Sequence, residues 1–313
     1  MRQLFKTVLI LLTIAVFACG CKKEDTEEPT VTSHDFTVEQ WAEFIDQKEA
    51  AQAEAAKRAA EEAANGDTGT NGTDGSEQSQ NSSSSDNPAD SGSSLTDPTP
   101  TPAPVTVIVI DPGHGGGYTG ATYNKVVEKD LTLKTAKFAR DYLEDNYENV
   151  EVYLTREEDK ALADNLVDDL EKRAKIAKEH KANALVSIHF NASENHNRTG
   201  TYIYVSRRSQ VKDECKGLAR AIMKELTELG TKERAIEERK SNDMFDDSGD
   251  AYDYYAINRH CAARNIPGII VEQCFMDNEE DRQFIESDMA LKMLGEANAR
   301  GIAEYYGLTR KAE

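Results

Sequence analysis

Two things are scarce in this sequence: clusters of basic residues and cysteines. Acidic side chains outnumber basic ones by 57 to 37, which gives a formal net charge of −20. Nucleic-acid binding requires lysines and arginines gathered on one face, so this composition argues against nucleic acid or another polyanion as a ligand. Two common catalytic motifs are also absent. Without an HExxH helix or the Lys-Ser/Thr of a phosphate-binding loop, we expect neither a thermolysin-type protease nor a P-loop site.

The few cysteines do not have the spacing of a metal site. Of the five, three lie in the second half of the chain, Cys215, Cys261 and Cys274, and no two form a C-x-x-C pair. A disulfide needs a specific geometry that sequence spacing does not supply. We therefore expect three buried free thiols, with a Cys261–Cys274 disulfide as the alternative.

The beginning of the chain has the pattern of a lipoprotein export signal. Arg2 and Lys6 precede an apolar stretch at residues 8–17, which is too short to span a bilayer as a mature helix. Small residues and two cysteines follow, so we expect the first 21 residues to be a lipoprotein-type signal with Cys21, or else Cys19, acylated. The lipid would anchor the protein at the outer face of the cytoplasmic membrane. An ordinary cleaved signal with an incidental cysteine pair is the alternative.

The rest of the chain divides into a linker and one folded domain. Residues 22–104 are acidic and Ala/Glu-rich at first, then rich in Ser, Gly, Asn and Pro, as in a flexible tether. About 40 coil-like residues of this kind reach roughly 35 Å on average. Residues 105–309 carry nearly all the branched aliphatic side chains and are long enough to bury a sizeable core.

The domain alternates short apolar runs with helical patterns. The runs are rich in β-branched residues, as in strands buried on both faces of a parallel sheet, and lie at residues 105–110, 150–154, 184–188, 202–205 and 266–271. Apolar positions with helical spacing occur around residues 131–143, 166–177, 215–229 and 284–302. We therefore predict an α/β domain with a mostly parallel twisted sheet flanked by helices.

Polar residues with metal-binding chemistry follow several of the apolar runs. His114 follows the first run, His189 the third and Glu272 the last, and Glu128 stands where a helix is expected to begin. Ligand sites of open α/β sheets lie at the carboxyl ends of the strands. Two imidazoles and two carboxylates are the groups of a catalytic zinc site, in which water takes the fourth position. Each residue alone also has a common structural explanation, such as a satisfied polar group or a favourable charge at a helix start, so both interpretations stay open at this point.

Several motifs together resemble a known family. They are IDPGHGG at 110–116, EKD at 128–130, LTR at 154–156, SIHFNA at 187–192, and IVE at 270–272 with Phe275 and Asn278. In this order and spacing, residues 105–306 resemble the type 3 domains of zinc-dependent N-acetylmuramoyl-L-alanine amidases, which are bacterial cell-wall hydrolases.

The resemblance implies a reaction and a set of site residues. The substrate would be peptidoglycan, and the bond cleaved would be the amide between N-acetylmuramic acid and the L-alanine of the stem peptide. Zn²⁺ would be held by His114, Glu128 and His189, with Glu272 as the catalytic carboxylate and Asn191 near the ligands or in the substrate groove. Two alternatives remain: a catalytically silent or regulated wall-binding module, and a zinc amidase or peptidase that acts on another amide.

The sequence departs from the family pattern in two places. Gln273-Cys274-Phe275 replaces the usual Leu-Gly-Phe after the catalytic glutamate, which affects the packing behind Glu272. Residues 231–255 are polar and acidic, and we expect a loop that lines the groove.

Other polar residues of the domain are expected to have structural roles. For Arg156 and Arg173 we predict carboxylate partners inside the fold. No chemistry is expected of the three remaining histidines, His180, His196 and His260.

Overall fold

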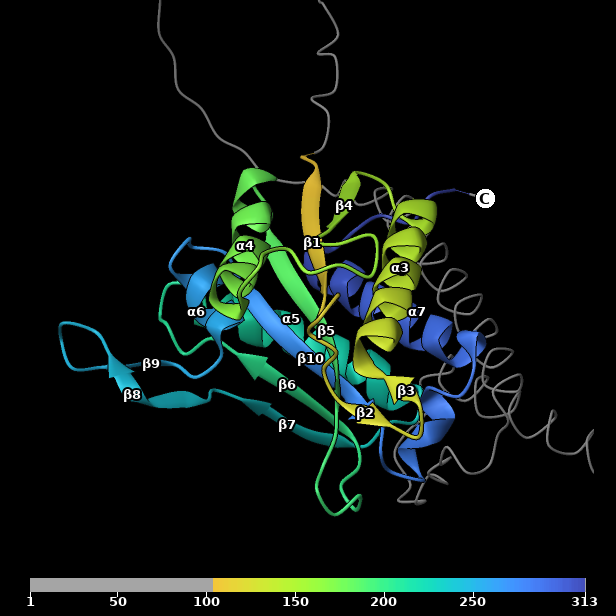
Figure 1. Ribbon diagram of the computed structural model, residues 1–313. Coiled ribbons are helices and arrows are strands. Elements are labelled where there is room, and N and C mark those ends of the chain that lie inside the picture. The colour runs from red at the N-terminus through yellow and green to blue at the C-terminus, as the bar shows by residue number, and fades with distance from the viewer. Residues whose placement is uncertain (1–103, 313) are drawn as a thin grey trace, which may run out of the picture. The chain divides into compact units, whose positions relative to one another are not determined.

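The computed structural model describes residues 104–312 (Figure 1). The predicted export signal, both of its cysteines and all but the last residue of the predicted linker lie outside the described residues. Within the described part, none of the helices combines the length and the apolar character that crossing a membrane would require.

A six-stranded sheet forms the centre of the domain, with the strand order β4-β1-β5-β10-β6-β7 (Figure 1). The first four strands in this order are parallel to one another, whereas β6 pairs with β10 in the antiparallel sense and β7 runs parallel to β6. The strands are β1 (Thr106–Pro112), β4 (Val150–Leu154), β5 (Ala184–Asn191), β6 (Thr201–Val205), β7 (Glu233–Glu237) and β10 (Gly268–Phe275). The predicted mostly parallel sheet is thus confirmed.

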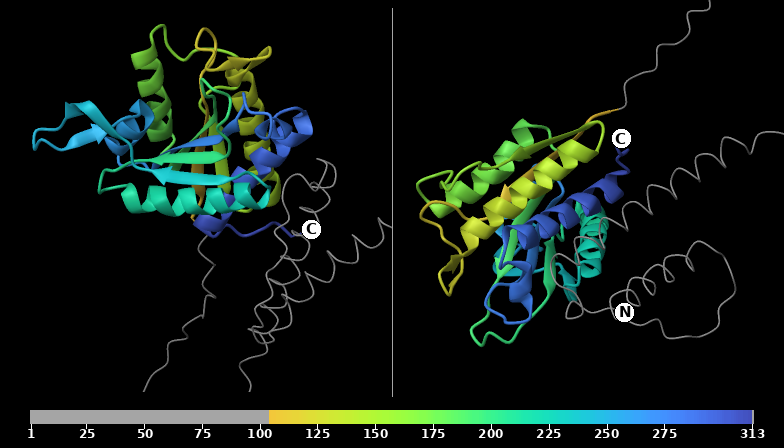
Figure 2. Two further views of the ribbon diagram at one scale, coloured as in Figure 1. Left: turned by 90° about the horizontal axis from the view of Figure 1, so that it is seen from below. Right: turned by 90° about the vertical axis from the view of Figure 1, so that its right-hand side faces the viewer.

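Helices cover both faces of this sheet (Figures 1 and 2). One face packs against α3 (Glu128–Asn146), α5 (Lys212–Glu228) and α7 (Asp288–Tyr306), and the other packs against α4 (Leu166–Glu179) and α6 (Ala256–Ala262). A short 3-10 helix, η2 (Asp281–Phe284), connects β10 to α7. Each helix covers the sheet because its apolar positions gather on one side.

The alternation of side chains along the central strands decides on which face the polar groups emerge. In β5, Val186 and Ile188 point to the face covered by α3, α5 and α7, whereas Leu185 points to the face covered by α4 and α6. Because successive side chains of a strand alternate, Ser187 and His189 share the face of Leu185. The candidate site therefore lies on the α4/α6 side, where β5 ends.

The expectation of a loop at residues 231–255 is wrong. This segment contains β7 and a hairpin made of β8 (Lys240–Phe245) and β9 (Ala251–Asp253), which extends beside α6 (Figure 1). Edge strands and hairpins of this kind face solvent, so they do not have the apolar run that marks a buried strand. A second small hairpin, β2 (Thr122–Tyr123) with β3 (Val126–Val127), leads into α3 and was also not predicted.

Close packing of α3 against α7 depends on a glycine. A Cβ atom at Gly295 of α7 would lie 2.7 Å from the Cβ of Phe138 and 2.7 Å from the backbone carbonyl of Thr135. Both atoms belong to α3, and the carbonyl cannot move without shifting the helix. Gly295 therefore sets the distance between the two helices.

We expect Gly295→Ala to lower the free energy of unfolding by about 1–2 kcal/mol, because the overpacking exceeds the roughly 1 kcal/mol that alanine gains in helix propensity. Urea denaturation followed by circular dichroism measures the change. Gly117→Ala is the matched control, since a Cβ there meets no atom within 4 Å. Equal stability of the two variants would contradict the packing argument.

Candidate metal centre and active site

The segment after β1 delivers His114 through an unusual backbone conformation. His114, Gly115 and Gly116 all have positive φ angles, of 63°, 129° and 58°. Glycine adopts such angles without steric cost, which explains the two glycines after the histidine. Gly113 has a different role, because a Cβ there would collide with the ring of His189.

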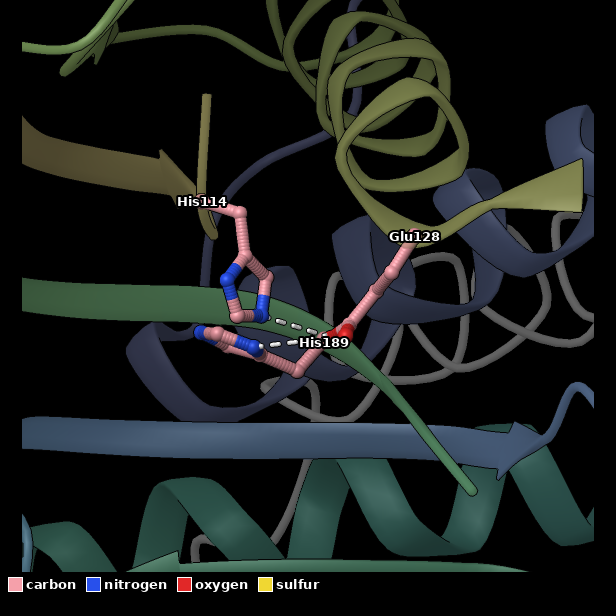
Figure 3. Close-up of side chains that lie close together, drawn as sticks. All are labelled: His114, Glu128 and His189. Carbon is pink, nitrogen blue, oxygen red and sulfur yellow. Dashed lines mark hydrogen bonds and ion pairs between the residues drawn. The ribbon is translucent and has the colours of Figure 1, made fainter. Parts of the chain in front are cut away.

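Glu128, the first residue of α3, joins the two histidines (Figure 3). Its Oε1 lies 3.1 Å from His114 Nε2 and 3.0 Å from His189 Nδ1. The same oxygen accepts a hydrogen bond from the backbone N–H of Phe190, and Oε2 accepts one from that of Ala121. One potential ligand atom from each of the three side chains lies within 4.8 Å of the other two. The structure thus brings together the three side chains that were predicted to bind metal.

The electrostatic environment favours the protonation states that a metal ligand needs. Burial alone would raise the pKa of Glu128, but hydrogen bonds and charge from His114 and His189 hold it well below its usual range. Burial lowers the pKa of His189, although the charge of Glu128 opposes this effect. An ionised carboxylate and a neutral imidazole are the forms that bind divalent cations.

Glu272 lies on the strand next to His189. β10 and β5 are parallel, and Glu272 pairs in register with His189, so both side chains emerge on the same face of the sheet. Burial, together with the charge of Glu128, raises the pKa of Glu272 well above its usual range. Asn191 ends β5 two residues beyond His189 and is half-buried, and its carbonyl accepts a hydrogen bond from Met276. The two glutamates thus have opposite pKa shifts.

A buried ion pair lies close to the three candidate metal ligands. Asp111 is fully buried, and its carboxylate lies 2.8 Å from Arg173 Nη1 and accepts a hydrogen bond from Ser187. Burial would raise the pKa of Asp111, but Arg173 and the hydroxyls of Ser187 and Thr155 hold it below its usual range. Arg173 also pairs with Asp169 and donates to the carbonyl of His114. The predicted carboxylate partners of Arg173 are confirmed.

Within residues 104–312, Arg156 does not have the predicted carboxylate partner. Its guanidinium, which is 1% exposed, donates instead to the backbone carbonyls of Pro112, Gly113 and Lys129 and to the Thr132 hydroxyl. The planar guanidinium has donors enough to reach several carbonyls at once, which the sequence pattern does not reveal. Arg156 therefore connects the His114 loop to the first turn of α3, where Glu128 lies.

The core accommodates Gln273 and Cys274, which replace the Leu and Gly that usually follow the catalytic glutamate in the family. Gln273 forms a buried amide pair with Asn298 of α7, with a distance of 2.9 Å from Asn298 Nδ2 to Gln273 Oε1. Cys274 is fully buried. Cys215 and Cys261 are buried as well, and all three thiols are free, as predicted.

The remaining histidines stay outside the cluster. His180 stacks on Tyr153 with ring centroids 3.7 Å apart, and the pKa of His260 is lowered by partial burial. His196 Nδ1 lies 2.7 Å from the buried carboxylate of Asp277. This partner was not predicted, because the two residues are 81 positions apart.

The fold and the cluster define an α/β domain with a candidate metal centre at the carboxyl ends of its central strands. Residues 108–304 match the sequence profile of the N-acetylmuramoyl-L-alanine amidase family known as Amidase_3. The chain belongs to this family of bacterial cell-wall amidases.

Individual relatives agree with the family match. The chain is 32% identical over 207 residues to the endolysin of Bacillus phage SPP1. The alignment covers 66% of this chain and 68% of the endolysin. It is also 32% identical over 207 residues to the N-acetylmuramoyl-L-alanine amidase CwlM of Bacillus licheniformis, covering 66% and 70%.

Solved structures show the same fold. Cwp6 from Clostridium difficile has a TM-score of 0.55 and 31% identity, covering 64% of this chain and 29% of that one. The catalytic domain of CwlV, an amidase from Bacillus (Paenibacillus) polymyxa, has a TM-score of 0.53 and 26% identity, covering 66% and 100%.

We expect Arg156→Lys to weaken metal binding at the candidate centre by about 10- to 100-fold, because lysine cannot donate to the carbonyls of Pro112, Gly113 and Lys129 at once and the His114 loop loses its connection to α3. Competition with a chromophoric chelator measures the affinity. Arg140→Lys is the control, since Arg140 is a more exposed arginine that pairs with Glu157. Native affinity in a folded Arg156→Lys protein would disprove a role for these contacts.

Proposed function

We propose that this domain cleaves the amide bond between N-acetylmuramic acid and the L-alanine of the peptidoglycan stem peptide. We further propose that His114, Glu128 and His189 would hold a Zn²⁺ ion that would supply the activation of the attacking water. The observation that carries the zinc proposal is the convergence of these three donors from the segment after β1, from α3 and from β5 (Figure 3). Two imidazoles and one carboxylate are a donor set that zinc prefers and that leaves a position for water.

The chemistry then depends on Glu272. When bound, zinc lowers the pKa of a water molecule and polarises the scissile carbonyl. Glu272 accepts the proton of the attacking water at its carboxylate and donates it to the nitrogen of L-alanine as the bond breaks. A carboxylate with a raised pKa suits this transfer, because it holds the proton between the two steps. We also propose that Asn191, two residues beyond His189 on β5, contacts the substrate near Glu272.

Three results test the reaction. Purified protein with zinc should release stem peptides with an L-alanine N-terminus from peptidoglycan, and a chelator should abolish the release. Glu272→Gln should lower the rate by at least about 100-fold while zinc content stays unchanged, because only the proton transfer is lost. Product masses and free N-termini identify the bond.

Glu279→Gln is the matched control, since Glu279 is an exposed carboxylate shortly after β10. Binding to peptidoglycan without release, by zinc-loaded and folded protein, would favour a silent or regulated wall-binding module. Release of a different N-terminus would favour an amidase or peptidase that acts on another amide.

We also propose that the domain at residues 105–309 works in the cell envelope on a lipid-anchored tether formed by residues 22–104. The support is the lipoprotein-type pattern of residues 1–21 and the composition of the linker. A tether of this length would let the domain search the wall around its anchor.

Cys21→Ser should abolish lipid attachment and move the protein from the membrane fraction to the soluble fraction, whereas Cys19→Ser should not. Membrane fractionation and mass spectrometry of the N-terminal peptide measure both effects. Lipid retained in Cys21→Ser but lost in Cys19→Ser would assign the anchor to Cys19. Lipid absent from the wild-type protein would leave only an ordinary export signal.

A further inference from the structure

β6 carries two tyrosines on the face of the sheet that holds Glu272. In its sequence TYIYV, Ile203 and Val205 are buried in the core beneath α5 and α7, so Tyr202 and Tyr204 point to the opposite face. Tyr202 pairs in register with Glu272 across the antiparallel β6–β10 ladder. Cross-strand partners have neighbouring side chains, so Tyr202 lies beside the proposed catalytic carboxylate.

These tyrosines continue into a longer row toward the β8–β9 hairpin. The ring centroids of Tyr202 and Tyr204 are 6.4 Å apart, those of Tyr204 and Tyr255 are 4.5 Å apart, and those of Tyr255 and Tyr254 are 5.0 Å apart. We name these four residues the tyrosine row. The first three are half-buried and Tyr254 is 46% exposed, so the row is accessible from solvent.

An arginine lies on the rings at each end of the tyrosine row. The guanidinium of Arg198 lies 5.6 Å from the ring centroid of Tyr202 and donates to its hydroxyl. At the other end, the guanidinium of Arg239 lies 4.1 Å from the ring centroid of Tyr254 and donates to the Tyr255 hydroxyl. Contacts with the tyrosine rings thus hold both cations at the surface.

These two arginines differ from most others of the domain. Seven arginines pair with a carboxylate: Arg140, Arg173, Arg207, Arg208, Arg264, Arg282 and Arg300. Among residues 104–312, neither Arg198 nor Arg239 has an ion pair with a carboxylate, although the chain has a net charge of −20. The charges of Glu272 and Glu237 act on Tyr204 in the middle of the row. An anion from outside the domain is therefore the natural partner of the two cations.

We propose that the tyrosine row binds the acidic stem peptide of the substrate, whose carboxylates pair with Arg198 and Arg239. This inference rests on the proposed function, because that function places the scissile bond beside Glu272. The distance along the row from Tyr202 to Tyr255 corresponds to about three residues of an extended peptide. The tyrosine rings offer a rigid apolar surface to the peptide backbone, and the guanidinium groups supply charge-assisted hydrogen bonds at each end.

Fluorescence anisotropy of a labelled tripeptide, L-Ala-γ-D-Glu-L-Lys with free carboxylates, tests the site in the zinc-loaded full chain. The double variant Arg198→Gln/Arg239→Gln should bind about tenfold or more weakly, since two charged contacts are lost. The same peptide with its carboxylates converted to amides should bind weakly to both proteins. With the matching muramyl tripeptide, KM should rise by a similar factor while kcat stays unchanged.

Arg220→Gln is the control for charge, because Arg220 is exposed on α5 at the opposite face of the sheet and should leave the affinity unchanged. Equal affinity of the wild-type protein and a folded double variant overturns the proposal, even if hydrolysis is normal. Arginine-dependent binding without any hydrolysis supports the tyrosine row and rejects the proposed reaction instead. The peptide site on the tyrosine row and the proposed reaction can therefore be disproved separately.

Discussion

The buried ion pair between Asp111 and Arg173 is the interaction on which the site depends. A fully buried carboxylate is costly unless it is paired and hydrogen-bonded, and Asp111 draws its partners from α4, from β5 and from the segment after β4. These elements meet where β1 ends, close to His114 and to His189 of β5. Arg173 then uses a further donor to hold the carbonyl of His114. The ion pair thus determines the position of the loop that carries the first proposed ligand.

The sequence predicted the parts of the fold that repeat a simple pattern. All five apolar runs became strands of the sheet and all four helical patterns became helices, because burial on both faces of a parallel sheet requires such continuous runs. The ends of the parallel strands brought His114 and His189 to one edge of the sheet, whereas the full set with Glu128 was implied by the resemblance to the amidase family. Patterns that repeat within one element were enough for the strands and helices alone.

The features that escaped prediction depend on contacts between distant residues. Arg156 binds backbone carbonyls, which no choice of neighbouring residue types can signal. The β8–β9 hairpin is polar because it faces solvent, so its sequence resembles a loop. The tyrosine row combines β6 with residues near position 255. Only the half on β6 has a pattern in the sequence, the alternation of tyrosines in TYIYV.

The two glutamates show how one sheet edge gives identical side chains different chemistry. Glu128 accepts hydrogen bonds from the backbone of Ala121 and Phe190 and lies between two imidazoles, so its charged form is stabilised. Glu272 is half-buried and lies near the charge of Glu128, and both effects disfavour its charged form. Repulsion between the two carboxylates therefore pushes their pKa values apart, and the one with more donors stays ionised. An ionised group suits metal binding and a group that readily holds a proton suits proton transfer, so the surroundings of the two glutamates agree with the roles proposed for them.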